Sequence, residues 1–188
     1  MAGILESLGK EGLIVNGQAT PPNLAFIDPS SKIRVIGEDV TADDLKGAEV
    51  LMVLDTSAWA QLGPMGEILR GTEAKKVVFD HHVSEDDLGA ITLKDTRAEA
   101  TGRLVAEAAV QLGIELTSEL AAPLYAAIAT DTGWFRFGST TGNTMRVAGN
   151  LIEAGADPTK IFADLYEQDT IGRVKLRGRI LERFTTEL

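Results

Sequence analysis

The sequence contains no cysteine and only two histidines, which lie side by side at positions 81 and 82. Disulfides and thiolate metal sites are therefore excluded, and His, Asp and Glu remain as metal ligands. The lack of cysteine also agrees with a reducing compartment. A chain that uses histidine nowhere else places both copies directly after an apolar run, in VVFDHH. This pairing is the first indication of a functional site.

Long apolar runs and excess positive charge are also lacking. No stretch approaches the roughly 18 apolar residues of a membrane span, and the N-terminus lacks a signal-peptide pattern, so we expect a cytoplasmic protein without membrane contact. The 18 Lys and Arg residues against 28 Asp and Glu residues give a net charge of −10, which argues against a broad grip on duplex nucleic acid. With 188 residues, 44% of them hydrophobic, the chain is long enough for one domain.

The order of short β-rich runs and helical periods predicts an α/β fold. Two runs, LMVL and VVF, are continuously apolar, which is typical of central strands in a parallel sheet covered on both faces. From residue 98 onward the apolar spacing is helical, and several segments end at a glycine. We therefore predict a mainly parallel five-stranded sheet flanked by helices, with strands at residues 13–15, 33–37, 49–55, 75–80 and 90–93.

Acidic residues follow two of these strands at their carboxyl ends, where ligand sites of parallel α/β sheets lie. Asp55 ends one strand, and Asp80 ends the next and is followed by His81 and His82. Asp131 follows an apolar helix. Acids gathered at one edge repel one another unless a cation neutralises them, so Asp55, His81 and Asp131 together predict a metal site for Mn²⁺, Mg²⁺, Fe²⁺ or Zn²⁺. Taken singly, each acid has the alternative role of a helix N-cap.

Four separated stretches, in order, carry a resemblance to a known family. They are MVLDTSAWAQLG, VVFDHH, AEATGRLV and IATDTGWFRFGSTT. Together they closely resemble the DHH phosphoesterase superfamily, in particular its branch of nanoRNases and 3′-phosphoadenosine 5′-phosphate (pAp) phosphatases. The resemblance extends over essentially the whole chain.

The resemblance implies a hydrolase with two metal ions, usually Mn²⁺, with Mg²⁺ as the second choice. It implies that Asp55 bridges the metals, that His81 and Asp131 bind the second metal, and that His82 contacts the scissile phosphate. Asp80 is expected to orient the histidines from behind. Arg136 is a further candidate for a phosphate contact, with a surface ion pair as the alternative. Trp134 and Phe135 are expected to pack in the core rather than to stack on a base.

Two parts of the family pattern are not found in this sequence. One is the first motif, a His followed by Asp-x-Asp, and the other is the C-terminal substrate-binding lobe with its Gly-Gly-Gly-His type motif. We therefore interpret residues 1–188 as a DHH catalytic domain that begins inside a family helix, and residues 168–188 as a connector helix towards that lobe. An unpaired hydrophobic strand edge, and hence self-association, is expected to follow.

The leading functional hypothesis is metal-dependent hydrolysis of phosphoesters in short single-stranded RNA or in small nucleotides such as pAp. Two alternatives stay open. One is cyclic-dinucleotide phosphodiesterase activity, which the same motifs leave open. The other is a catalytically incomplete fragment that binds a metal or a partner chain.

Overall fold

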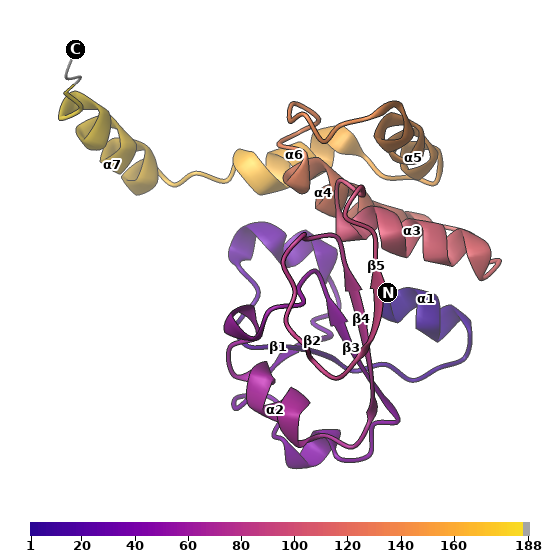
Figure 1. Cartoon of the computed structure of the whole chain (residues 1–188). Coiled ribbons are helices and arrows are strands. Elements are labelled where there is room, and N and C mark those ends of the chain that lie inside the picture. The colour runs from indigo at the N-terminus through magenta and orange to yellow at the C-terminus, as the bar shows by residue number, and fades with distance from the viewer. Residues whose placement is uncertain (186–188) are drawn as a thin grey trace.

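The computed structural model describes residues 1–185 and is an α/β fold, as the sequence predicts, with all of its strands before residue 95 and five consecutive helices after residue 100 (Figure 1). Five strands and seven α-helices are present in that range, together with three short 3₁₀ segments. The strands are β1 Ile14–Asn16, β2 Ile33–Val35, β3 Val50–Leu54, β4 Lys75–Asp80 and β5 Ile91–Lys94. The helices are α1 Ala2–Ser7, α2 Met65–Gly71, α3 Thr101–Gln111, α4 Ser118–Asp131, α5 Gly142–Glu153, α6 Pro158–Tyr166 and α7 Ile171–Glu182.

The five predicted strands are confirmed within one or two residues, but the prediction of one five-stranded sheet is wrong. The strands form two parallel sheets, one of β1 and β2 and one in the order β3-β4-β5. Residues of β1, β2 and β3, among them Ile14, Ile33 and Leu54, line a cavity of about 810 Å³. The two sheets therefore face a common cavity instead of sharing a hydrogen-bonded ladder.

Strand β3 is less buried than its continuous apolar sequence predicts. Leu51, Met52 and Val53 are half-buried, while Val50 and Leu54 are exposed. The reason is that β3 is the edge strand of its sheet, whereas β4 lies between two strands and buries Val78 and Phe79. The expected self-association depends on this open apolar edge and stays a prediction.

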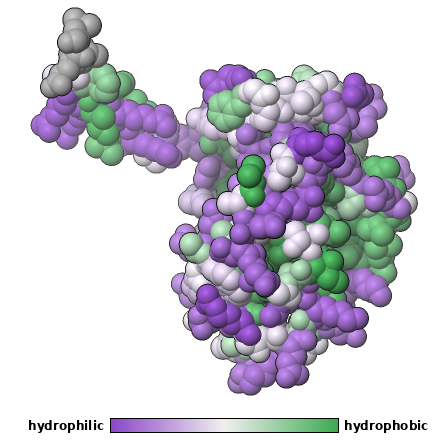
Figure 2. Space-filling view, viewed as in Figure 1, coloured by the Kyte–Doolittle hydropathy of each residue, from purple (hydrophilic) through white to green (hydrophobic). Residues whose placement is uncertain are grey.

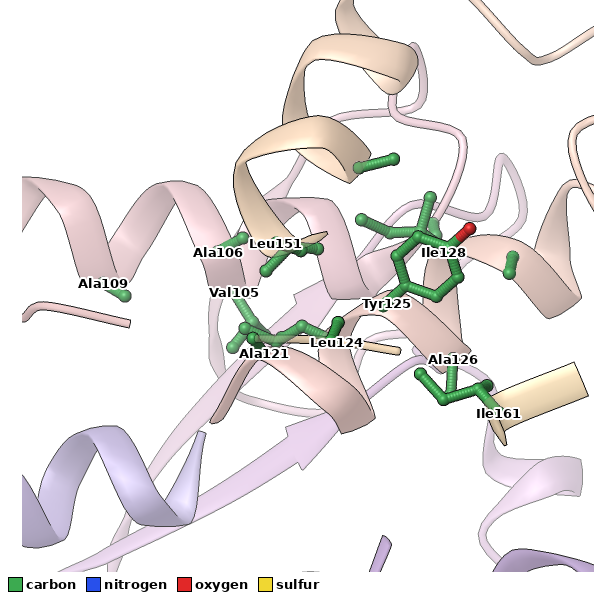
Figure 3. Close-up of a cluster of buried hydrophobic side chains, with 14 of the residues drawn as sticks. Val105, Ala106, Ala109, Ala121, Leu124, Tyr125, Ala126, Ile128, Leu151 and Ile161 are labelled. Atoms are coloured by element: carbon green, nitrogen blue, oxygen red, sulfur yellow. The ribbon is translucent and has the colours of Figure 1, made fainter. Parts of the chain in front are cut away.

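Most of the hydrophobic core lies among the helices α3, α4 and α5 (Figure 3). Many of its buried side chains are alanines, such as Ala109, Ala121 and Ala129, which allow the helix axes to approach closely. A smaller cluster around Leu69 of α2 and Val78 of β4 packs against the sheet, and α3 contacts β4 as well. The sheet is thereby fixed against the helical layer, which places the end of α4 near the ends of the strands.

Helix α7 extends away from the rest of the molecule (Figure 1). Every residue from Ile171 to Thr185 is exposed, and hydrophobic and hydrophilic side chains both cover its surface in Figure 2. The expected connector, residues 168–188, includes this helix, while its last three residues lie outside the described part of the chain. Its role as a connector stays a prediction. Among residues 1–185, none of the helices has the length and apolar character needed to cross a membrane.

The contact between α3 and α4 leaves no room for a side chain at Gly102. A Cβ atom there would lie 2.8 Å from the Cβ of Ala127 and 3.3 Å from the carbonyl oxygen of Leu124. We expect Gly102→Ala to lower the free energy of unfolding by about 1–3 kcal/mol, because the helices must move apart. Gly149→Ala in α5 is the matched control, since its Cβ meets nothing within 4 Å. The control should gain about 0.5–1 kcal/mol, and urea unfolding of both variants checks the pair.

Candidate metal centre

The carboxyl ends of β3 and β4 bring four of the predicted site residues to one edge of the sheet. Leu54 pairs with Phe79 in the parallel register, so Asp55 and Asp80 follow neighbouring strand ends. His81 and His82 continue from Asp80. Asp131 arrives from the helical layer as the last residue of α4. The convergence of these five residues follows from strand register and from the packing of α4.

Asp55 occupies a backbone conformation that few side chains adopt. Its φ angle is +69°, in the left-handed region, where Asp and Asn are tolerated better than other non-glycine residues. Its N–H still donates to the carbonyl oxygen of Phe79 at 2.8 Å. The chain therefore turns sharply at the point where the carboxylate meets His81. Strained residues of this kind are concentrated at functional sites.

Asp80 is fully buried and is the anchor of both histidines. Its Oδ1 accepts hydrogen bonds from the backbone N–H of His81 at 2.8 Å and of His82 at 3.2 Å, and from Nδ1 of His82 at 2.7 Å. Its Oδ2 accepts from the Ser57 hydroxyl at 2.5 Å. Burial raises the pKa of the Asp80 carboxyl, but these hydrogen bonds outweigh that effect and hold the pKa below its ordinary value.

His81 points its free nitrogen at two carboxylates. Its Nδ1 lies 3.1 Å from the carbonyl oxygen of Ala98, and because a carbonyl only accepts, Nδ1 carries the proton. The lone pair of a neutral ring is then on Nε2, which is 3.6 Å from Oδ1 of Asp55 and 3.5 Å from Oδ2 of Asp131. A nitrogen lone pair and two carboxylate oxygens thus face one point.

These separations match the space that a divalent cation requires. Ligands about 2.0–2.2 Å from an ion are about 3–3.6 Å apart in octahedral or tetrahedral geometry. Asp55, His81 and His82 also each offer a ligand atom within 4.8 Å of the other two. Because Asp80 holds Nδ1 of His82, the only free nitrogen of that ring is Nε2. Asp55, His81 and Asp131 therefore form a donor set that fits a cation such as Mn²⁺ or Mg²⁺, with Nε2 of His82 close by.

The electrostatics of Asp131 point in the same direction. Burial raises the pKa of the Asp131 carboxyl, and the negative charge of Asp55 raises it further, while the two histidines act in the opposite sense. The C-terminal end of α4 adds partial negative charge at the same place. A cation between the carboxylates would remove this repulsion.

The alternative role of these acids as helix caps is not supported. The N-cap of the 3₁₀ segment after Asp55 is Ala58, and Asp131 ends a helix rather than beginning one. Two residues of the acidic run that follows the histidines have structural roles. Asp86 accepts a hydrogen bond from the N–H of Trp59 at 2.8 Å, and Asp87 accepts one from Gly89 at 2.8 Å.

Arg136, Trp134 and Phe135 lie in the turn that follows Asp131. The Arg136 guanidinium donates to the carbonyl oxygen of Gly133 at 2.7 Å, and no ion pair of Arg136 occurs within residues 1–185. Its contact with a phosphate stays a prediction. Trp134 and Phe135 pack against the core, with the Trp134 ring 5.0 Å from that of Phe162, so the expectation of core packing is confirmed.

Two residues of the site were missed in the sequence. Ser57 is buried and donates to Asp80, and Lys94, the last residue of β5, contacts both of them. The parallel register pairs Asp80 with Lys94. Lys94 could therefore have been found by placing the ends of the predicted strands side by side. Ser57 gave no such signal, because it follows β3 in an irregular segment.

Comparison with known proteins gives several curated relatives. No protein-family model matches the chain. The Bacillus subtilis bifunctional oligoribonuclease and PAP phosphatase NrnA is 35% identical over 58% of this chain and 36% of its own length. The Thermus thermophilus protein of the same name is 32% identical over 80% of this chain and 43% of its own length. The chain thus spans less than half the length of these curated relatives.

Among solved structures, an exopolyphosphatase-related protein from Bacteroides fragilis superposes with a TM-score of 0.91 at 23% identity. The match covers 98% of this chain and 55% of that one, and it shows a shared fold. Fold, strand-end histidines and sequence similarity together relate the chain to the DHH phosphoesterases. In sequence, the chain is a distant homologue of the NrnA proteins.

The repulsion at Asp131 predicts a pH-dependent gain in stability for Asp131→Asn without divalent cations. The folded-state pKa is raised above 3.8, so the folded state binds more protons than the unfolded state between the two pKa values, and stability falls as pH rises through that window. At pH 7 the variant should therefore be more stable than the parent. Near pH 3 the difference should vanish.

Thermal unfolding in EDTA at both pH values provides the measurement. Glu153→Gln is the matched control, because Glu153 is an exposed acid at the last position of α5. It should change stability little. Equal gains for both variants would assign the effect to helix ends in general rather than to crowding of Asp55 and Asp131.

Proposed function

We propose that this chain carries the cation-binding part of a phosphoester hydrolase. The observation that supports the proposal most directly is the approach of Asp55, His81 and Asp131 to one point, with His81 fixed in the tautomer that presents Nε2. Mn²⁺ is the proposed cation, and Mg²⁺ is the second choice. Homology to the NrnA proteins supports the same reaction class.

In this proposal, three side chains bind the cation and His82 contacts the phosphate. Asp55, His81 and Asp131 would hold the cation, and a cation bound there would lower the pKa of a bound water and neutralise charge on phosphate oxygens. His82 lies beside His81, with ring centroids 4.4 Å apart, and its Nδ1 is held by Asp80. Its other nitrogen is free to face a phosphate oxygen and to donate a hydrogen bond when the ring is protonated. Asp80 therefore sets the direction of the second histidine.

The proposed substrates are short single-stranded RNA and small nucleotides such as pAp. This choice is supported by the names of the curated relatives, which are oligoribonucleases and PAP phosphatases. The acidic net charge of −10 disfavours a broad grip on duplex nucleic acid and leaves a cation as the main attraction for a short anionic substrate. Cyclic dinucleotides are the alternative substrate class.

A binding module without hydrolase activity is the second candidate. The observation that favours it is that His81 and the two carboxylates form a donor set for one cation. Both candidates require the same first step, which is cation binding. They differ in whether the bound cation supports turnover, so one set of variants tests both.

His81→Ala should remove Mn²⁺-induced stabilisation, while His82→Ala should retain most of it. A tenfold excess of Mn²⁺ over Kd stabilises the folded state by about 1.4 kcal/mol, which corresponds to a rise in Tm of about 3–6 °C for a domain of this size. The neighbouring histidines make a matched pair of variants. Differential scanning fluorimetry with and without Mn²⁺ provides the measurement.

Hydrolysis of a short RNA and of pAp by the same three proteins then separates the two candidates. A hydrolase should lose turnover in both variants, His81→Ala through the cation and His82→Ala through the phosphate contact. Binding without turnover in the parent would favour the module. Equal Mn²⁺ shifts in the parent and His81→Ala would place the cation elsewhere and contradict the proposal.

A further inference from the structure

Lys94 lies behind the site and is almost enclosed by it. It is the last residue of β5, and its side chain is 11% exposed. Its ammonium donates to the Ser57 hydroxyl at 3.2 Å, to the carbonyl oxygen of Ser84 at 3.0 Å and to Glu85 at 3.0 Å. These contacts use all three of its protons. Lys94 therefore has no free donor for a substrate.

The same ammonium is the positive charge next to the buried Asp80 carboxylate. Its Nζ is 3.8 Å from Oδ2 of Asp80, and the Ser57 hydroxyl lies between them, bonded to both. A buried carboxylate needs hydrogen bonds and a counter-charge to remain ionised. The exposed pair of Lys94 with Glu85 is worth little by itself, so the buried side of the contact is the significant one.

Lys94 also fastens the loop that carries the histidines. Its bonds to Ser84 and Glu85 hold the segment directly after His82, and the Asp86 N–H donates to the carbonyl oxygen of Ser57 at 2.8 Å. The segment after β3, the loop after β4 and the end of β5 thus meet at one ammonium group. None of the described hydrogen bonds or ion pairs of Lys94 reaches Asp55, His81 or Asp131.

We propose that Lys94 and Ser57 are positioning residues that act on His82 through Asp80. The ammonium and the hydroxyl fix Oδ2 of Asp80, which leaves Oδ1 as the acceptor for Nδ1 of His82. A carboxylate in that place requires the proton of a neutral His82 ring to be on Nδ1 and directs Nε2 outward. The expected effect on the rate of hydrolysis rests on the proposed function. The expected effect on the tautomer of the His82 ring does not.

The two histidines make a direct test accessible. Nδ1 of each ring faces a hydrogen-bond acceptor, the Ala98 carbonyl for His81 and the Asp80 carboxylate for His82. ¹H–¹⁵N correlation spectra of the metal-free protein at pH 8.5 should therefore show two imidazoles in the Nδ1–H form. In Lys94→Met, the His82 signals should move towards the Nε2–H form, while those of His81 stay in place, because its acceptor is the Ala98 carbonyl. Ser57→Ala should move His82 in the same direction by a smaller amount.

Lys46→Met is the matched control, since Lys46 forms an exposed ion pair with Asp43. It should leave both rings unchanged. Circular dichroism checks folding, and if Lys94→Met does not fold, Ser57→Ala decides the outcome by itself. An unmoved His82 in the folded variants would overturn the proposal. Equal movement of both rings would do the same, because it would indicate general loosening of the site.

Kinetics provide the second readout. Lys94→Met should lower kcat for RNA or pAp by about 10-fold with little change in KM, as expected for loss of support behind a catalytic side chain. The Mn²⁺ affinity should stay within about threefold of the parent, because the cation ligands are untouched. A parent without hydrolase activity would contradict the proposed function alone, since the ring tautomers still decide the role of Lys94 and Ser57.

Discussion

The geometry of the site depends on one buried carboxylate. Asp80 accepts hydrogen bonds from two consecutive backbone N–H groups, an imidazole and a serine hydroxyl, with an ammonium group close by. Without that anchor, the chain after β4 would have no reason to place two adjacent imidazoles in fixed and different directions. Asp80 gives the two histidines different roles, because it accepts a hydrogen bond from the ring of His82 but only from the backbone N–H of His81. The ring of His81 is free to take its orientation from Ala98 and to face the acids.

The remaining constraint is topological. Parallel strands end on the same edge of a sheet, so neighbouring strands deliver Asp55, Asp80 and Lys94 together. The left-handed turn at Asp55 and the C-terminal end of α4 then add two carboxylates close to one another. The close approach of the two carboxylates is unfavourable without a cation, because their negative charges repel one another.

Much of this arrangement could be predicted from local sequence pattern. Short β-rich runs gave all five strands, because strand propensity depends on residues near one another in the chain. Acids at strand ends gave the gathering of Asp55, Asp80 and His81, because parallel strands end at one edge of a sheet. The pairing of β1 with β2 in a separate sheet was not predictable, since burial patterns do not specify which strand edges meet. The half-burial of β3 was not predictable for the same reason. Ser57 was missed because its importance comes only from Asp80, 23 positions away.

Central to the proposed site is that His81 and two carboxylates bind a single divalent cation while His82 does not. Electron spin echo spectroscopy of the Mn²⁺ complex tests it most directly, because nitrogen coupling reports imidazoles bound to the ion. We expect one coordinated imidazole, present in the parent and in His82→Ala and absent from His81→Ala. A spectrum without coordinated imidazole, or one that loses its nitrogen coupling in His82→Ala instead, would contradict it.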